Sequence, residues 1–179
     1  MTKHQIARRV GAAALGLLLA VGTARAADTK DAWITMKTKV ALMTTDGVST
    51  KNLNVDTVNG VVTLHGQVPT TAEKVKAEDV ARKIDGTKEV KNLLQVVPTA
   101  KRDVVDRRDD VIQKSVEDAF NANRRVKDSG IKVASVNNGV VLLSGKTRSM
   151  EAYLESVEVA DAVAGVRRVS TEVEVVPVS

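Results

Sequence analysis

Few side chains in this sequence could take part in the chemistry of a catalytic or metal-binding site. The chain has no cysteine, and His65 is the only histidine after residue 26. The lack of cysteine excludes a disulfide, a thiol nucleophile and a CxxC site, and one histidine alone does not complete a metal site. A hydrolytic set could be assembled from Ser144, His65 and an acid, but Ser144 replaces His65 in a second copy of the same pattern. We therefore expect a non-enzymatic protein without metal or cofactor, with His65 on the exposed face of a strand.

Basic residues gather in two loops of the second half of the chain: Arg124, Arg125, Lys127, Lys146 and Arg148. The loops flank a predicted β-hairpin, so they are expected at the same end of one sheet. One interpretation is that these side chains are solvated loop charges. The other is that the cluster, which lies near Phe120 and Val126, binds anionic phospholipid headgroups, with a binding free energy of about 1 kcal/mol per basic residue. The matching loops of the first half offer only Lys51, with Asp46 against it. Any lipid affinity is therefore expected in the second half.

An internal repeat determines the predicted architecture. Residues 58–68 read VNGVVTLHGQV and residues 136–147 read VNNGVVLLSGKT. From Gly60 onward the two copies match at an offset of 79, and before the hairpin they match at an offset of 78. The extra residue of the second copy is assigned to its turn, at Asn137. Two folded copies of one unit are expected.

Each copy predicts the order helix, strand, strand, helix, strand. In the first copy Asp31 is expected to cap a helix with apolar positions Trp33, Ile34, Val40 and Ala41. Two strands then flank an Asn59-Gly60 turn, and Thr70 begins a capping box. Residues 90–97 form a strand in which Val90, Asn92, Leu94 and Val96 share one face. The second copy has a helix through Val111, Ile112, Val116, Ala119 and Phe120, strands over 131–136 and 140–143, a helix over 149–164 and a strand over 169–176. The predicted fold class is α+β, with two tandem αββαβ domains, each a small three-stranded mixed sheet with two helices on one face.

Residues 1–26 have the pattern of a cleaved secretory signal peptide, with Lys3, Arg8 and Arg9 before an apolar run and Ala24-Arg25-Ala26 after it. The run is shorter than the roughly 20 residues needed to span a bilayer. Its removal leaves 23 basic and 22 acidic residues, so net charge gives no reason to expect nucleic acid as a partner. We expect a soluble periplasmic protein without a lipid anchor or a transmembrane segment in the mature chain. The expected domains are 29–98 and 109–178, with 99–108 a charged linker or helix extension.

The repeated pattern resembles the BON-domain family. The resemblance lies in N-G-V-V-x-L-x-G at both hairpins, an alanine-bearing helix, a glycine, and then V-x-N-x-L at 90–94 or V-x-T-x-V at 169–173. It covers essentially all of the chain after residue 26, with departures at Thr87 and Thr171. It implies a non-enzymatic envelope protein linked to osmotic or general envelope stress, whose domains bind phospholipid surfaces. The alternative is a periplasmic chaperone that binds unfolded or outer-membrane protein clients through apolar helix faces or strand edges.

Overall fold

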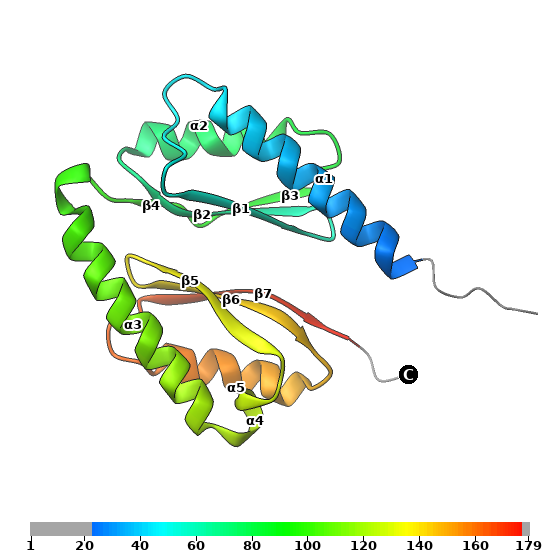
Figure 1. The fold of residues 1–179 in the computed structure, drawn as a ribbon, viewed down its shortest axis with the longest axis vertical. Coiled ribbons are helices and arrows are strands. Elements are labelled where there is room, and N and C mark those ends of the chain that lie inside the picture. Colours follow the sequence, from blue (N-terminus) through cyan, green and yellow to red (C-terminus); the bar gives the residue numbers. More distant parts are fainter. Residues whose placement is uncertain (1–22, 177–179) are drawn as a thin grey trace, which may run out of the picture.

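The computed structural model describes the backbone of residues 23–176 and the side chains of residues 29–176, and it contains two α+β units (Figure 1). Most of the predicted signal peptide lies outside these residues. The first unit consists of α1 (Thr23–Met43), β1 (Leu53–Val58), β2 (Val61–Val68), α2 (Thr71–Arg82), β3 (Glu89–Asn92) and β4 (Gln95–Val96). The second consists of a 3-10 turn η1 (Thr99–Lys101), α3 (Arg102–Ala122), α4 (Arg124–Lys127), β5 (Ile131–Asn137), β6 (Val140–Thr147), α5 (Met150–Asp161) and β7 (Arg168–Val175). The predicted fold class is confirmed.

Both sheets have the predicted mixed topology. β1 pairs with β2 antiparallel and β2 pairs with β3 parallel, while β5, β6 and β7 repeat this order. Each hairpin turns on an Asn-Gly pair at positive φ, 54° and 82° at Asn59 and Gly60, and 46° and 74° at Asn138 and Gly139. These are the backbone angles that the two central positions of such a turn require.

The extra residue of the second copy lies in a strand, so its assignment to the turn at Asn137 was wrong. The pairing of β5 with β6 shifts register between Val133 and Ser135, which makes Ala134 the additional residue of a β-bulge. The turn Asn138-Gly139 has the same length as Asn59-Gly60. The bulge restores the register, so Ser135 occupies the place that Asp56 has in the first copy.

The first helix differs from its prediction in two respects. α1 already begins at Thr23, so Asp31 is not its N-cap. The Asp31 carboxylate instead accepts hydrogen bonds from the backbone N–H groups of Asn59 and Gly60, at 2.7 and 2.8 Å. Of the apolar positions that indicated this helix, Trp33 and Val40 are exposed. The buried face of α1 carries Ile34, Thr38 and Leu42 instead.

The last strand of the first unit is interrupted. The Asn92 side chain donates to the Lys74 carbonyl oxygen and to Glu78, and accepts from the N–H of Leu94, at 3.0, 3.0 and 3.2 Å. These bonds separate β3 from β4, and beyond the break Val97 is buried while Val96 is exposed. The prediction of one continuous strand, with Val96 on the same face as Val90 and Leu94, was therefore wrong. The second copy has Thr171 at this position, and its β7 is continuous.

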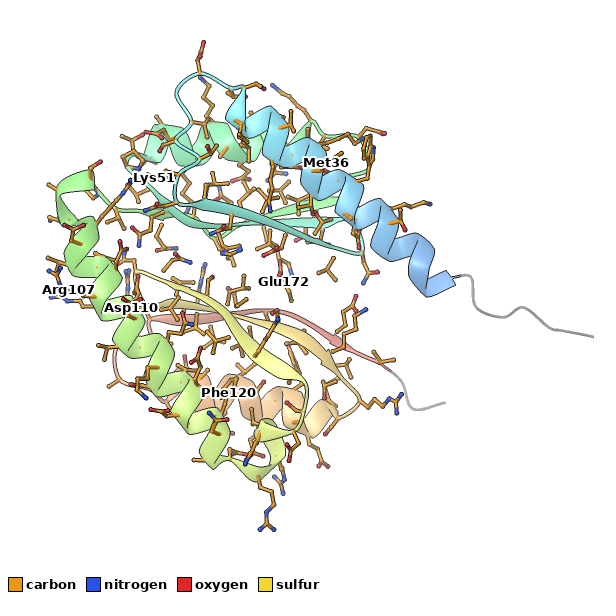
Figure 2. The ribbon with its side chains drawn as sticks, in the orientation of Figure 1. Met36, Lys51, Arg107, Asp110, Phe120 and Glu172 are labelled. Atoms are coloured by element: carbon orange, nitrogen blue, oxygen red, sulfur yellow. The ribbon has the colours of Figure 1, made fainter. Side chains whose placement is uncertain are left out.

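The two sheets face each other, with the helices outside, so the molecule has four layers, helix, sheet, sheet and helix (Figures 1 and 2). Val141 and Leu143 of β6 point into the core of the second unit. Because side chains alternate along a strand, Val140 and Leu142 point away from that core, yet both are buried. The first unit covers them.

Candidate functional site

The loops with the five predicted basic residues come together at one end of the second sheet. Asn123 caps the short helix α4, because its side-chain oxygen accepts from the N–H groups of Arg125 and Val126 at 2.9 and 3.2 Å. The antiparallel pairing of Ile131 with Gly145 brings the start of β5 beside the end of β6. We call Arg124, Arg125, Lys127, Lys146 and Arg148 the basic pole.

Three members of the basic pole surround one hollow of about 620 Å³. Arg125, Lys146 and Arg148 line it, together with Asp128 and Glu151. Arg124 and Lys127 lie on the same short helix as Arg125 and are exposed, but they do not line the hollow.

Acidic partners reduce the charge of two members of the pole. Arg125 pairs with Glu155 at 2.8 Å, and Lys146 pairs with Glu174 at 2.9 Å. Hydrogen bonds from Asn123 and then from Arg125 hold the pKa of Glu155 below its ordinary value, so this carboxylate stays charged. The positive charge of the surface therefore comes mainly from Arg124, Lys127 and Arg148, whose side chains are exposed.

The apolar side chains expected near the pole are buried. Phe120 and Val126, at 6% and 1% exposure, belong to the core of the second unit. They help to hold α4 against α3 and α5 and are not available to a membrane. The basic pole therefore gains no exposed apolar surface from Phe120 or Val126.

A second polar cluster joins the two units. His65 Nε2 lies 2.8 Å from Asp56 Oδ2, and His65 Nδ1 lies 3.0 Å from Ser135 Oγ in the other sheet. The hydrogen bond with His65 is the main cause that lowers the pKa of Asp56. Acid, imidazole and hydroxyl follow each other in the order of a hydrolytic triad, but His65 is buried between the sheets and Ser135 also accepts a hydrogen bond from Asn137 at 3.1 Å. The hydrogen bonds of His65 with Asp56 and Ser135 link the two sheets.

The burial of His65 corrects the expectation that it is exposed. Its side chain does lie on the face of the first sheet that turns away from the core of its own unit, as strand alternation predicts. The second unit covers that face. Two further contacts cross the boundary, Asn59 Nδ2 to Glu174 at 2.9 Å and Gln67 Nε2 to Asp106 at 2.8 Å.

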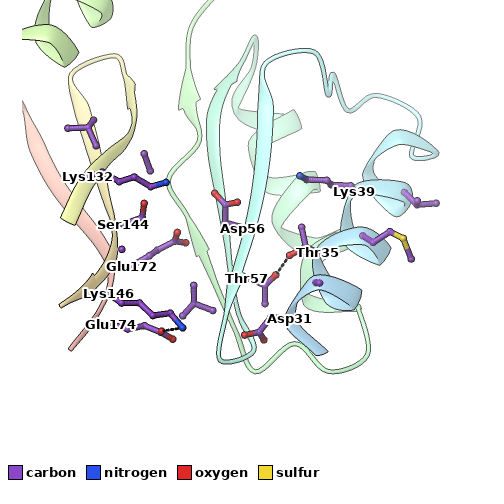
Figure 3. A pocket seen from close by; sticks show the side chains of 17 residues that line it. Asp31, Thr35, Lys39, Asp56, Thr57, Lys132, Ser144, Lys146, Glu172 and Glu174 are labelled. Atoms are coloured by element: carbon purple, nitrogen blue, oxygen red, sulfur yellow. Dashed lines mark hydrogen bonds and ion pairs between the residues drawn. The ribbon is translucent and has the colours of Figure 1, made fainter. Parts of the chain in front are cut away.

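Beside this contact the units leave a hollow of about 870 Å³ between α1, β1 and the second sheet (Figure 3). Lys132 and Glu172 reach into it from the second sheet, opposite Asp56. Burial is the main cause that raises the pKa of Glu172, and a hydrogen bond with Thr63 opposes it. The Asp56 carboxylate raises this pKa further, whereas His65 and Lys91 lower it. The hollow has charged walls of both signs.

Sequence reasoning missed the carboxylates that fix the hairpin turns. Asp109 accepts from the N–H groups of Asn138 and Gly139 at 2.6 and 2.9 Å, as Asp31 does for the first turn. An aspartate at both positions, at the offset of 78 that holds before the hairpin, was the signal that could have identified this role. Each carboxylate fixes the hairpin turn of its own unit.

No helix within residues 23–176 combines the length and the apolar character needed to cross a bilayer. In the same part of the chain no cluster of three or more histidine, aspartate or glutamate side chains could hold a metal ion.

Comparison with known proteins identifies relatives of this chain. It is 30% identical over 145 residues to the osmotically-inducible protein Y of Escherichia coli, covering 80% of this chain and 72% of that protein. It is 32% identical over 117 residues to the outer membrane lipoprotein DolP of Haemophilus influenzae, covering 65% of this chain and 59% of that protein.

A solved structure, the C-terminal domain of CdsD, the structural protein of the type III secretion system of Chlamydia trachomatis, matches 82% of this chain and 67% of that one. Its TM-score of 0.33 and identity of 14% are too low to support an argument. The model of the BON domain, by contrast, matches residues 30–98 and 108–177. With two matched segments that together make up most of its length, the chain belongs to the BON-domain family.

Proposed function

We propose that this protein works in the periplasm as an envelope protein of the osmotic-stress type. The names of two relatives support this proposal, since one is osmotically inducible and the other is an outer membrane lipoprotein. The pattern of residues 1–26, typical of a signal peptide for secretion, supports export of the chain.

Within that setting, the second domain binds anionic phospholipid surfaces through the basic pole. The observation that supports this function is the convergence of two loops that lie far apart in the sequence, with Arg125, Lys146 and Arg148 around one hollow and Arg124 and Lys127 exposed beside it. Basic side chains near an anionic leaflet contribute about 1 kcal/mol each.

The first domain lacks an equivalent surface among its described residues. At the corresponding end, Lys51 is exposed and the Lys76 ammonium donates to the backbone carbonyl of Asp46. Lipid affinity is therefore assigned to the second domain.

Co-sedimentation with vesicles tests this assignment. Residues 27–179 should sediment with anionic vesicles, not with neutral ones, and the bound fraction should fall at high salt because exposed charges are screened. The variant Arg124→Glu, Arg125→Glu, Lys127→Glu should bind about 100-fold more weakly, since it loses three contributions of about 1 kcal/mol.

Two further variants serve as controls. The variant Lys101→Glu, Arg107→Glu, Arg108→Glu makes the same change of net charge elsewhere, at exposed sites, and should keep its binding. Arg124→Gln, Lys127→Gln, Arg148→Gln leaves the Arg125–Glu155 pair in place and should still weaken binding. Equal binding by the Arg124 charge-reversal variant and the Lys101 control would contradict the proposal, as would binding to neither kind of vesicle.

One observation favours a second candidate, the binding of protein segments. The outer surface of α1, in the first domain, carries large apolar side chains. Among its described residues this domain has no counterpart of the basic pole.

A further inference from the structure

An apolar stripe runs along the solvent-facing side of α1. Trp33, Met36, Val40 and Met43 are 56%, 48%, 56% and 72% exposed. Their spacing of three, four and three residues places them on one side of the helix. The opposite side, with Ile34, Thr38 and Leu42, is buried in the core. α1 is thus apolar on both sides, whereas a surface helix ordinarily presents polar residues to solvent.

The second domain shows that this fold does not need the stripe. α3 packs as α1 does, because Ile112 contacts Gly165 as Ile34 contacts Gly86, with the isoleucine Cδ1 atom 3.0 Å from the Cβ that each glycine would gain. At the positions equivalent to the stripe, α3 carries the following residues: Val111, Lys114, Asp118 and Asn121. Three of these four are polar or charged, so the apolar residues of α1 are not a requirement of the domain.

The stripe borders the hollow between the two domains. Met36 and Val40 line that hollow together with residues of β1 and of the second sheet. A flat bilayer surface does not follow a concave wall of this kind, whereas one polypeptide segment fits along it. Amphipathic helices bind in this way, with anchors at intervals of three and four residues.

Lysines flank the stripe on both sides. At 100° per residue, Lys30 and Lys37 lie along one edge and Lys39 along the other. Lys37 also lies over the Trp33 ring, 5.8 Å from its centroid, donates to the Asp85 carbonyl oxygen at 3.2 Å and pairs with the exposed Asp85 carboxylate at 3.7 Å. Lys30 and Lys39 are exposed to solvent. A second copy of α1 laid antiparallel on the stripe would bring these lysines together, which disfavours self-association. The lysines along the edges of the stripe therefore favour a partner with acidic side chains.

We propose that the stripe of α1 docks an amphipathic helix of another protein, one with an apolar seam and aspartate or glutamate along its edges. The apolar seam covers Trp33, Met36, Val40 and Met43, and the acids meet the lysines. This site is separate from the basic pole and does not depend on lipid binding there.

Trp33 is the only tryptophan of the chain and therefore reports on its own site. The probe is a synthetic helical peptide of about three heptads, with leucine at positions a and d, glutamate at e and g, and no aromatic residue. Titrated into residues 27–179, it should shift the Trp33 emission to shorter wavelength as the ring leaves water. A peptide with lysine at e and g should bind at least about tenfold more weakly, because it repels the flanking lysines.

The decisive variant is Met36→Lys, Val40→Asp, Met43→Asn. It gives α1 the residues that α3 carries, leaves the net charge unchanged and retains Trp33. This variant should no longer bind the peptide, but it should still unfold cooperatively on heating. Met43→Asn alone, at the most exposed position, should fold and weaken binding. Val111→Thr, at the position of α3 that corresponds to Trp33, is the matched control and should bind as well as the unmodified protein.

Several results would overturn the proposal. One is equal binding of the two peptides, and another is no shift of the Trp33 emission with either. The same emission shift with anionic vesicles and without peptide would also overturn it, as would a shift that depends on protein concentration in the absence of peptide. Failure of the vesicle experiment on the basic pole would leave this result unaffected, so the two proposals are separable.

Discussion

His65 has hydrogen-bonding partners on two strands, one in each domain. Asp56 binds one ring nitrogen from the same sheet and Ser135 binds the other from the facing sheet. Hydrogen bonds to both ring nitrogens offset the free-energy cost of removing this polar side chain from water. The imidazole therefore stabilises the contact between domains while remaining polar.

Glu172 makes the opposite contribution at the same boundary. Burial raises the pKa of its carboxyl above the ordinary value of 4.5, and the nearby Asp56 carboxylate adds to the effect. A raised pKa in the folded state means that the stability contribution is full below pH 4.5 and is lost as the pH rises through the folded-state pKa. At neutral pH the charged side chain thus opposes folding.

We predict that Glu172→Gln raises the unfolding free energy at pH 7, because it removes this charge, and that the gain disappears below about pH 4.5. Denaturant unfolding of both proteins across this range measures the difference. Glu158→Gln, at an exposed site of α5, is the control and should show little difference at either pH. A gain for Glu172→Gln that is constant with pH would contradict the assignment.

At the scale of the element, each long strand β2 and β6 contains a glycine that close packing requires. Gly66 has φ of 112°, and an added Cβ would overlap the Asn52 carbonyl oxygen. That oxygen accepts the N–H of Gln67 at 2.8 Å, so it cannot move away without loss of this bond. Gly145 has the same relation to the Gly130 carbonyl oxygen.

Gly66→Ala should therefore cost about 3 kcal/mol or more, since it combines strained backbone angles with the overlap. Gly47→Ala is the control, because its φ is also positive but the nearest atom, Lys76 Nζ, is 3.5 Å away and belongs to a flexible side chain. It should cost about 1 kcal/mol. Chemical denaturation gives both values, and equal costs would show that the carbonyl oxygen is not the cause.

The helices and strands could be predicted from the sequence because each of them occurs in both copies of the repeat. The Asn-Gly turns, the Thr70 cap and the strand order followed from local residue chemistry, and the repeat excluded chance. Prediction failed where a single copy departs from the pattern. The change of offset showed that the second copy has an extra residue, but its position at Ala134 depends on strand pairing. The break after Asn92 depends on side-chain bonds to another element.

At the scale of the whole molecule, the relation of the two domains could not be predicted from the sequence. The facing surfaces carry polar residues such as Thr63, His65 and Gln67, which read as solvent-exposed strand positions. Val140 and Leu142 are among the apolar residues buried at this contact. The predicted lipid-binding residues did converge, but the sequence did not show the carboxylates Glu155 and Glu174 that partly neutralise them.

The four-layer arrangement gives the molecule two separate surfaces. The basic pole lies at one end of the second sheet, and the apolar stripe lies on α1 of the first domain. We propose that the first binds anionic headgroups and the second an amphipathic helix. A vesicle should therefore contact the pole and leave α1 free.

NMR of residues 27–179 with anionic vesicles that carry a headgroup spin label tests this division most directly. The account predicts that the label broadens the backbone amide signals of residues 124–127 and 146–148 and leaves those of residues 33–43 sharp. Broadening centred on residues 33–43, or none at either place, would contradict it.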